Sequence, residues 1–413
     1  MTQAGAVASN ARRWAITGLL FISGFINYLD RGILSVALPV IALELHLDPT
    51  AKGILLSAFF WSYALMQVPM GWLSDRFNLR WVYAGAFALW SLACGFSGLT
   101  TSLGVLLVLR VVLGVGEAVY LPGGMKAVSL FFDAKDRGLA SGLVNCGTRA
   151  GLALGAPLVA VLIVAMGWKN TFLVVGFVSL LWIVPWLSVY PAHAGSGPTT
   201  AKNHPGRSFT WMDRNLLALS SANFCYAYYW YILVTWLPDY LVVSRHMELR
   251  KAGFFAAIPY LIYGTAEPVG GWIADCLVRF GWSEMRSRKV VITIAYLCSV
   301  LLLPVGFVAN DTGAILLIAG AALVGLATGN MLALLQRVAP SGDVGLWTGF
   351  MNFGGNLSGI VGPIVTGILI TRTHSYYPGF VVSVAVLLSG LPFFGKWMLK
   401  DRKEPAIAEA RQD

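Results

Sequence analysis

The stretch YALMQVPMGWLSD at residues 63–75 returns in altered form as YGTAEPVGGWIAD at residues 263–275. The two stretches align without a gap and share a tyrosine, a glycine, a tryptophan and an aspartate. Gln67 of the first stretch stands opposite Glu267 of the second. A long-range repeat of this kind indicates two copies of one structural unit.

A second pair of stretches supports the duplication. GLVNCGTRAGLALG at residues 142–155 aligns with GFMNFGGNLSGIVG at residues 349–362, and Arg149 stands opposite Asn356. The two pairs occur in the same order, and each keeps small residues at spacings typical of packed membrane helices. The chain therefore divides into two related halves, an organisation in which transporters bind substrate between the repeats.

The composition is that of an integral membrane protein. The 413 residues are 57% hydrophobic and only 12% charged, unlike a soluble domain. Nearly the whole chain divides into apolar segments of about 20–27 residues, long enough to cross a hydrocarbon core of roughly 30 Å as helices. We expect an all-α membrane protein with twelve spans near residues 14–40, 53–74, 81–100, 104–132, 138–165, 170–190, 215–243, 252–274, 289–309, 312–335, 345–371 and 377–398.

The spans form two pseudo-symmetric six-helix bundles. We expect the first bundle at residues 1–190, a polar linker at 191–213, the second bundle at 214–400 and a tail at 401–413. Most Lys and Arg residues outside the spans fall in the linker, the termini and the loops on their side, and few, Lys52 among them, fall on the other side. The positive-inside rule therefore predicts that both termini are cytoplasmic in a cell (inner) membrane. It also accounts for the net charge of +10 without nucleic acid.

Enzymatic motifs are absent. The five cysteines form no C-x-x-C motif, and none of the five histidines belongs to an H-E-x-x-H motif. G-x-S-x-G and a Walker A loop are also missing. We therefore expect no enzyme, no metal site and no cofactor.

Charged residues inside the spans are the strongest functional signal. One such residue at the bilayer centre costs at least about 2.5–3.5 kcal/mol, so it needs a role. A buried ion network that only holds the first bundle together is the structural alternative, but buried pairs add little net stability. The cations are Arg31, Arg110, Lys126 and Arg149, and the acids are Asp30, Glu117 and Glu267. Protonating an acid makes this set more positive, which attracts an anion.

Helix geometry restricts the partners of these charges. Arg110 and Glu117 lie seven residues apart, on one helix face but about 10 Å from each other, so they cannot touch. We expect Arg31 to pair with Glu117, and Asp30 to pair with either arginine.

Three further charges have two interpretations each. Arg149 lies near the midplane, and we expect it to face Asn356 across the two halves and to be satisfied by Glu117 or Asp30 and by bound substrate. Lys126 either serves the site or extends its stem to the cytoplasmic surface. Glu267 either takes part in coupling or pairs with a basic residue at an inner gate.

Two loop stretches resemble a known family motif. GWLSDRFNLR at residues 71–80, with its partial echo GWIADCLVRF at 271–280, is similar to the loop motif of the major facilitator superfamily. The resemblance implies the major facilitator fold. We expect a gating motif of Gly71, Asp75, Arg76, Arg80 and Asp275, in which the charges of Asp75, Arg76 and Arg80 form a cytoplasmic conformational latch in preference to a substrate site.

Other stretches resemble one branch of that family. NYLDR at residues 27–31, SYALMQVPMGWLSDR at 62–76 and LRVVLGVGEAVYLPGGMKA at 109–127 are similar to the anion:cation symporters, which include hexuronate, aldonate and aldarate importers. The resemblance implies that Asp30 and Glu117 couple protons and that Arg31 and Arg110 bind the anion. Arg149 departs from the sugar-acid members, which are usually uncharged at that position.

Neutral polar groups complete the candidate site. They either hydrogen-bond substrate hydroxyls or join helices to one another. They are Asn27, Tyr63, Gln67, Asn145, Thr148, Tyr226, Tyr229, Asn352 and Asn356.

These features together predict proton-coupled uptake of an organic anion by alternating access. The expected partners are a small organic anion, a proton and the lipid bilayer, with the chain acting as a monomer. A sugar acid such as a hexuronate or aldonate is the first choice, and an aromatic or dicarboxylic acid is the alternative. Proton-driven drug efflux is less favoured, because GLALGAP at residues 151–157 only partly matches the efflux motif and four intramembrane cations suit an anion.

Overall fold

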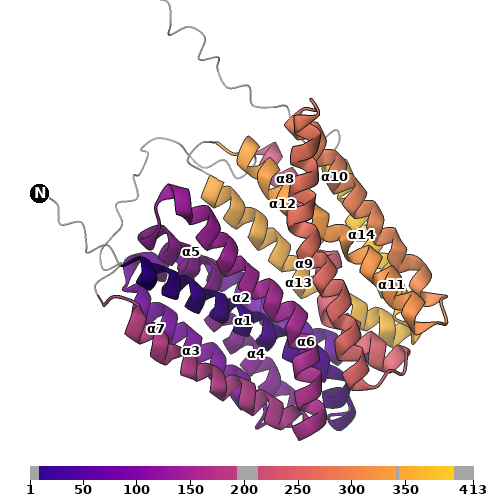
Figure 1. Cartoon of the computed structure of the whole chain (residues 1–413). Helices are drawn as coiled ribbons and strands as arrows, with labels where there is room; N and C mark the ends of the chain where they lie inside the picture. Colours follow the sequence, from indigo (N-terminus) through magenta and orange to yellow (C-terminus); the bar gives the residue numbers. More distant parts are fainter. Residues whose placement is uncertain (1–8, 193–212, 341–343, 395–413) are drawn as a thin grey trace, which may run out of the picture.

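The computed structural model describes residues 9–192, 213–340 and 344–394, and regular structure in these ranges is entirely helical. Almost all of the predicted linker at 191–213 and the whole predicted tail at 401–413 lie outside the described residues. Figure 1 shows two groups of helices side by side, coloured indigo to magenta and red to yellow.

The first group of helices supplies six membrane crossings. The helices are α1 (Asn10–Glu44), α2 (Pro49–Arg76), α3 (Leu79–Ser97), α4 (Leu103–Glu117), α5 (Tyr120–Phe131), α6 (Ala134–Ser179), the short 3₁₀ helix η1 (Leu180–Trp182) and α7 (Ile183–Val189). Helices α4 and α5 follow each other directly and form the fourth crossing. We call the end of the molecule that holds Glu44 the outer end, following the predicted topology, and the opposite end the inner end.

Helix α6 contains the fifth crossing and most of the sixth, because the chain reverses at Gly167. This residue has φ of 80° and ψ of 162°, a backbone conformation that glycine adopts without a Cβ clash. Before it, Gly151 packs on Phe25 and Gly155 on Leu29, so the chain runs parallel to α1. After it, Trp182 donates its Nε1–H to the backbone oxygen of Leu19 at 2.8 Å, so the chain runs back toward the inner end.

The second group repeats this plan. Its helices are α8 (Arg214–Asp239), the π-helical turn η2 (Tyr240–Ser244), α9 (Leu249–Arg279), α10 (Glu284–Cys298), the 3₁₀ helix η3 (Ser299–Gly306), α11 (Asp311–Ala321), the 3₁₀ helix η4 (Ala322–Gly325), α12 (Leu326–Val338), α13 (Val344–Thr373), α14 (Tyr377–Ser389) and α15 (Leu391–Phe394). Within the described ranges, nine helical stretches are long and apolar enough to cross a membrane, and one of them, Leu139–Val189, contains the reversal at Gly167 and hence two crossings. Helices α8 and α9, of 26 and 31 residues, are long enough to cross but are not among these nine stretches, and with them the number reaches the twelve predicted crossings.

Two helix pairs join the halves. Helix α2 packs on α13, and the first part of α6 packs on α9. Close approach depends on small residues: Gly53 lies against the backbone of Pro363, Gly367 against that of Pro49, and Gly253 against Ala156. The sequence repeat equates α2 with α9 and α6 with α13. Helix α2 therefore packs on the repeat mate of α6, and α6 packs on the repeat mate of α2, so repeat mates do not face each other.

Candidate functional site

A small central cavity lies between the halves. Its volume is about 40 Å³, room for only a few water molecules at about 10–15 Å³ each. Among the described residues, Arg31 and Arg110 are the only charged ones that line it. The others are Tyr28, Gly32, Leu34, Ser35, Leu56, Phe59, Phe60, Leu152, Trp230, Tyr231, Val234 and Thr235.

The predicted pair of Arg31 and Glu117 is confirmed. Arg31 donates its Nε–H to Glu117 Oε2 at 2.7 Å, and Glu117 is fully buried. The guanidinium carbon lies 4.5 Å from the ring centre of Phe59 and 4.4 Å from that of Tyr63, a cation–π arrangement. Tyr63 therefore belongs to this site. Arg31 Nη2 and Glu117 Oε1 are buried without partners among the described residues.

The expected ion pair between Asp30 and an arginine is absent from the described residues. Arg110 donates Nη1–H to the backbone oxygen of Asp30 at 3.4 Å, and its Nε and Nη2 are buried without partners there. The Asp30 carboxylate instead accepts the Cys94 thiol at 3.3 Å. The reason is helical geometry: neighbours on a helix point about 100° apart, so Arg31 reaches Glu117 on α4 while Asp30 turns toward α3.

Arg149 has a different partner from the expected ones. Its Nη2 lies 2.5 Å from Glu267 Oε2, and both side chains are 29% exposed. The guanidinium also lies 5.2 Å from the ring centre of Tyr263. The prediction of Asp30 or Glu117 as its partner, facing Asn356, is wrong because α6 packs on α9 and not on α13. Glu267 thus pairs with a basic residue across the halves, one of its two interpretations.

A second polar link joins the halves at the repeat-equivalent helix. Asn352 donates its side-chain N–H to Gln67 Oε1 at 2.8 Å, connecting α13 to α2. Gln67 and Glu267 are repeat mates, so the same position on each half carries a cross-link. Asn356 remains within the second half, where it accepts the hydroxyl of Tyr231 at 2.9 Å.

The other neutral candidates do not line the cavity. Tyr226 donates its hydroxyl to that of Tyr263 at 2.7 Å, and Tyr229 donates to the backbone oxygen of Ala321. Asn145 and Thr148 bond to backbone oxygens of their own helix. Asn27 is fully buried, and neither of its side-chain polar atoms has a hydrogen-bond partner in the described part of the chain.

The predicted latch residues gather at the inner end. Lys126 Nζ lies 3.2 Å from Asp75 Oδ1 and donates to the backbone oxygen of Ser74 at 2.5 Å, so it lies beside the predicted latch residues and not at the cavity. Arg80 donates to the backbone oxygen of Leu187. In the second half, Asp275 pairs with Arg288 at 3.3 Å.

The two remaining latch residues make fewer contacts. Gly71 lies beside Pro122 on α5, and Arg76 is exposed.

Sequence reasoning missed a buried ion pair at the outer end. Lys52 donates to both carboxylate oxygens of Asp239, at 2.9 and 3.1 Å, and Tyr376 donates its hydroxyl to Asp239 Oδ2 at 2.6 Å. By sequence, Lys52 falls just outside the predicted span at 53–74, and Asp239 falls near the end of the predicted span at 215–243. The sequence offers only one weak signal for this pair, a charge at the outer end of each of the two spans. It does not show that the two charges meet, because they lie in different halves.

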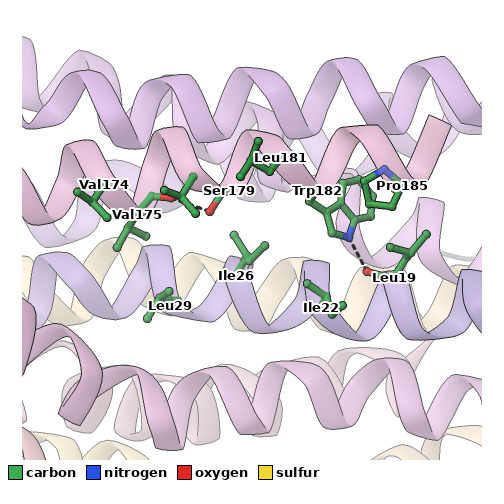
Figure 2. A pocket seen from close by; sticks show the side chains of 11 residues that line it. Leu19, Ile22, Ile26, Leu29, Val174, Val175, Ser179, Leu181, Trp182 and Pro185 are labelled. Atoms are coloured by element: carbon green, nitrogen blue, oxygen red, sulfur yellow. Dashed lines mark hydrogen bonds between the residues drawn. The ribbon is translucent and has the colours of Figure 1, made fainter. Parts of the chain in front are cut away.

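A second, apolar groove is not a candidate for the anion. It measures about 460 Å³ and lies between α1 and the returning part of α6 with η1 and α7. Figure 2 shows that Leu29, Ile26 and Ile22 face Val174, Leu181 and Trp182 across it. No described residue that lines it is charged, and Val178 and Leu181 are exposed at its rim. An apolar groove in a membrane-spanning bundle suits lipid chains and offers an anion no partner.

Comparisons with known proteins agree with this architecture. The family model of the Major Facilitator Superfamily matches residues 20–341 and 219–413. The chain is 30% identical over 398 residues to the hexuronate transporter of Bacillus subtilis (strain 168), covering 91% of this chain and 94% of that protein. It is also 30% identical over 405 residues to the D-galactonate transporter of Escherichia coli O6:H1 (strain CFT073), covering 92% and 94%. These sugar-acid relatives agree with the predicted family branch.

A solved structure supports the fold. The bacterial homologue of the human lysosomal transporter Spinster matches with a TM-score of 0.83 at 19% identity, covering 97% of this chain and 100% of that one. The chain is therefore a multi-pass membrane transporter of the Major Facilitator Superfamily, and not an enzyme.

Proposed function

We propose that the protein is a proton-coupled symporter that takes up a small organic anion, a sugar acid such as a hexuronate or aldonate, across the inner membrane. The observation that carries the proposal is the Arg31–Glu117 ion pair at a cavity between the halves, beside Arg110, two of whose N–H groups have no partner among the described residues. A buried carboxylate that holds an arginine is a group on which proton and anion can compete.

The competition supplies the coupling step. A proton on Glu117 removes the negative charge that holds Arg31, and a substrate carboxylate can then accept the planar guanidinium fork. Arg110 contributes its free N–H groups to the same anion. Asp30, fully buried beside Arg110, is the second proton acceptor. Residues of one chain line both sides of the cavity, so we propose that the transporter acts as a monomer. The distribution of Lys and Arg supports the further proposal that both termini lie in the cytoplasm.

Alternating access provides the route. A cavity of about 40 Å³ is too small for a hexuronate, so the two halves have to move apart to admit it. Lys52 and Asp239 close the outer end, and the links Arg149–Glu267 and Gln67–Asn352 hold the halves together further in. Transport then consists of breaking these contacts in turn around a site that stays in place.

The names of the relatives make sugar acids the first substrate class to test. One observation favours a second candidate, an aromatic acid: five of the fourteen residues that line the cavity are aromatic, namely Tyr28, Phe59, Phe60, Trp230 and Tyr231. Such a wall leaves buried sugar hydroxyls few partners, and each unpaired buried polar group costs about 1–3 kcal/mol.

Purified protein in proteoliposomes tests the proposal. We expect labelled D-glucuronate or D-galactonate to accumulate when the interior is alkaline, and to stop accumulating when the gradient is collapsed. Benzoate in the same assay tests the aromatic candidate. Accumulation that ignores the proton gradient would exclude symport, and gradient-driven export of ethidium without any acid transport would favour drug efflux.

A further inference from the structure

Asp30 lies at the contact of three helices in the first half and is fully buried. The charged and titratable groups near its carboxylate are Arg110 and Glu117 on α4 and Cys94 on α3. Arg31, its neighbour on α1, is turned toward Glu117. The surroundings of Asp30 thus contain one cation that is not committed to another carboxylate, namely Arg110.

Arg110 does not hydrogen-bond to the carboxylate of Asp30, however. It donates to the backbone oxygen of that residue at 3.4 Å. In the part of the chain that the structure describes, the one hydrogen bond to the carboxylate comes from the Cys94 thiol, with Sγ 3.3 Å from Oδ1. The second oxygen, Oδ2, is buried without a partner there. Cys94 is itself fully buried, so water does not compete for the contact.

The chemistry of this donor distinguishes it from the alternatives. A thiol is a weak hydrogen-bond donor, whereas a hydroxyl gives an ionised carboxylate a short, charge-assisted bond that is roughly twice as strong as a neutral one. Burying an ionised carboxylate is costly unless strong donors surround it. A thiol therefore orients the Asp30 side chain while stabilising its charge only slightly.

We propose that Cys94 is a positioning residue for proton coupling, which holds Asp30 toward α3 through a weak donor so that the carboxylate both accepts and releases a proton during transport. The proposal rests on the assignment of Asp30 as a proton acceptor in the proposed function. Cys94→Ser supplies a strong donor in nearly the same volume, and Cys94→Ala removes the donor.

Infrared titration of the purified, lipid-reconstituted protein tests this without any substrate. The carbonyl band of the protonated Asp30 side chain is identified by its loss in Asp30→Asn. We expect the midpoint of its titration to fall by about 0.5–1 pH unit in Cys94→Ser, the effect of one added hydrogen bond, and to stay or rise slightly in Cys94→Ala. The S–H stretching band of Cys94 should shift when Asp30 is replaced by Asn.

Cys225→Ser is the matched control, because Cys225 is also buried but lies 3.7 Å from the hydroxyl of Ser389 in the second half. It should leave the Asp30 midpoint unchanged. An identical midpoint in Cys94→Ser and Cys225→Ser, or the absence of any titrating Asp30 band, would overturn the proposal. Proton-driven uptake that persists in Asp30→Asn would instead refute the coupling role of Asp30, even if Cys94→Ser shifts the band.

Discussion

Lys52 on α2 and Asp239 at the end of α8 form a buried ion pair across the two halves of the molecule. Asp239 is fully buried and the Lys52 side chain is 8% exposed, with the ammonium group 2.9 Å from the nearer carboxylate oxygen. Thr50 and Thr371 add a hydroxyl contact at 2.8 Å between the same halves. The outer end therefore cannot open without separating two charges that are almost fully buried.

Lys52→Met is predicted to favour the outward-open state. Removing one partner of a buried pair costs about 3–5 kcal/mol, more than the roughly 1.4 kcal/mol that changes an equilibrium tenfold. Thr235 lines the cavity one turn before Asp239. A cysteine introduced there should react with an impermeant maleimide from outside at least tenfold faster when Lys52 is replaced.

Lys169→Met provides the comparison, because Lys169 pairs with Glu44 at the same end but within the first half, and both side chains are 40% exposed. It should not change the labelling rate at position 235. Equal acceleration by both substitutions would mean that general loosening, and not the link between the halves, governs access.

Glu117→Gln is predicted to separate coupling from transport. The amide keeps the shape of the side chain but cannot titrate, so uptake driven by a proton gradient should vanish while exchange of substrate across the membrane survives. Asp30→Asn should behave in the same way. The assay is accumulation and exchange of labelled substrate in proteoliposomes, with Glu44→Gln as the unaffected control. Equal loss of both activities would assign Glu117 a structural role.

Arg110→Lys is predicted to weaken anion binding by about tenfold or more. Lysine keeps the charge but removes the planar fork that grips a carboxylate, and a hydrogen bond to a charged group contributes about 1.5–3 kcal/mol. The measurement is substrate affinity from thermal shift or from competition for uptake. Arg245→Lys is the control, since Arg245 binds the backbone oxygen of Val308 at the outer end. Unchanged affinity in Arg110→Lys would show that this residue does not touch the ligand.

Arg149→Gln and Glu267→Gln are predicted to affect the motion of the halves and to leave substrate preference alone. Their ion pair links α6 to α9, so each single change leaves one charge unpaired, and the double change removes both. A double-mutant cycle on melting temperature should give a coupling free energy of about 0.5–1 kcal/mol, because the side chains remain partly exposed.

The transport rate of each variant is measured beside its melting temperature. The same substitutions in Arg13 and Asp136, a pair that lies within the first half, are the control and should leave the transport rate unchanged. A ligand panel completes the test. If Arg149→Gln lowers the affinity for dicarboxylates and for no other ligand, Arg149 contacts the substrate, contrary to this prediction.

The sequence predicts the fold and one central contact of the site for physical reasons that can be named. Hydrophobic length specifies the crossings, and the repeat specifies the halves. The Arg31–Glu117 pair follows because helix spacing keeps Glu117 away from Arg110. Arg149 could not be assigned in the same way, since a repeat shows which helices are equivalent but not which helices touch across the halves.

The partners of Lys52 and of Asp30 could not be predicted from the sequence for the same reason. Lys52 meets Asp239, and Asp30 meets Cys94, through contacts between residues far apart in the chain. In each case one partner is ordinary in its local sequence, a lysine near a loop or a cysteine in an apolar helix. Only the packing of the helices brings the two groups together.

The glycine contacts between α2 and α13 have a mechanical consequence. Gly53 and Gly367 bring the two backbones together near the outer end, so while that end stays closed, α2, with its 28 residues, can tilt only about this contact. Such a helix is about 42 Å long, so a tilt of roughly 10° about one end carries the other by about 7 Å. An alanine side chain at either glycine would push the two backbones apart at this contact. The absence of a Cβ at two positions near the outer end thus limits how far the inner end of α2 can move, at the opposite face of the membrane.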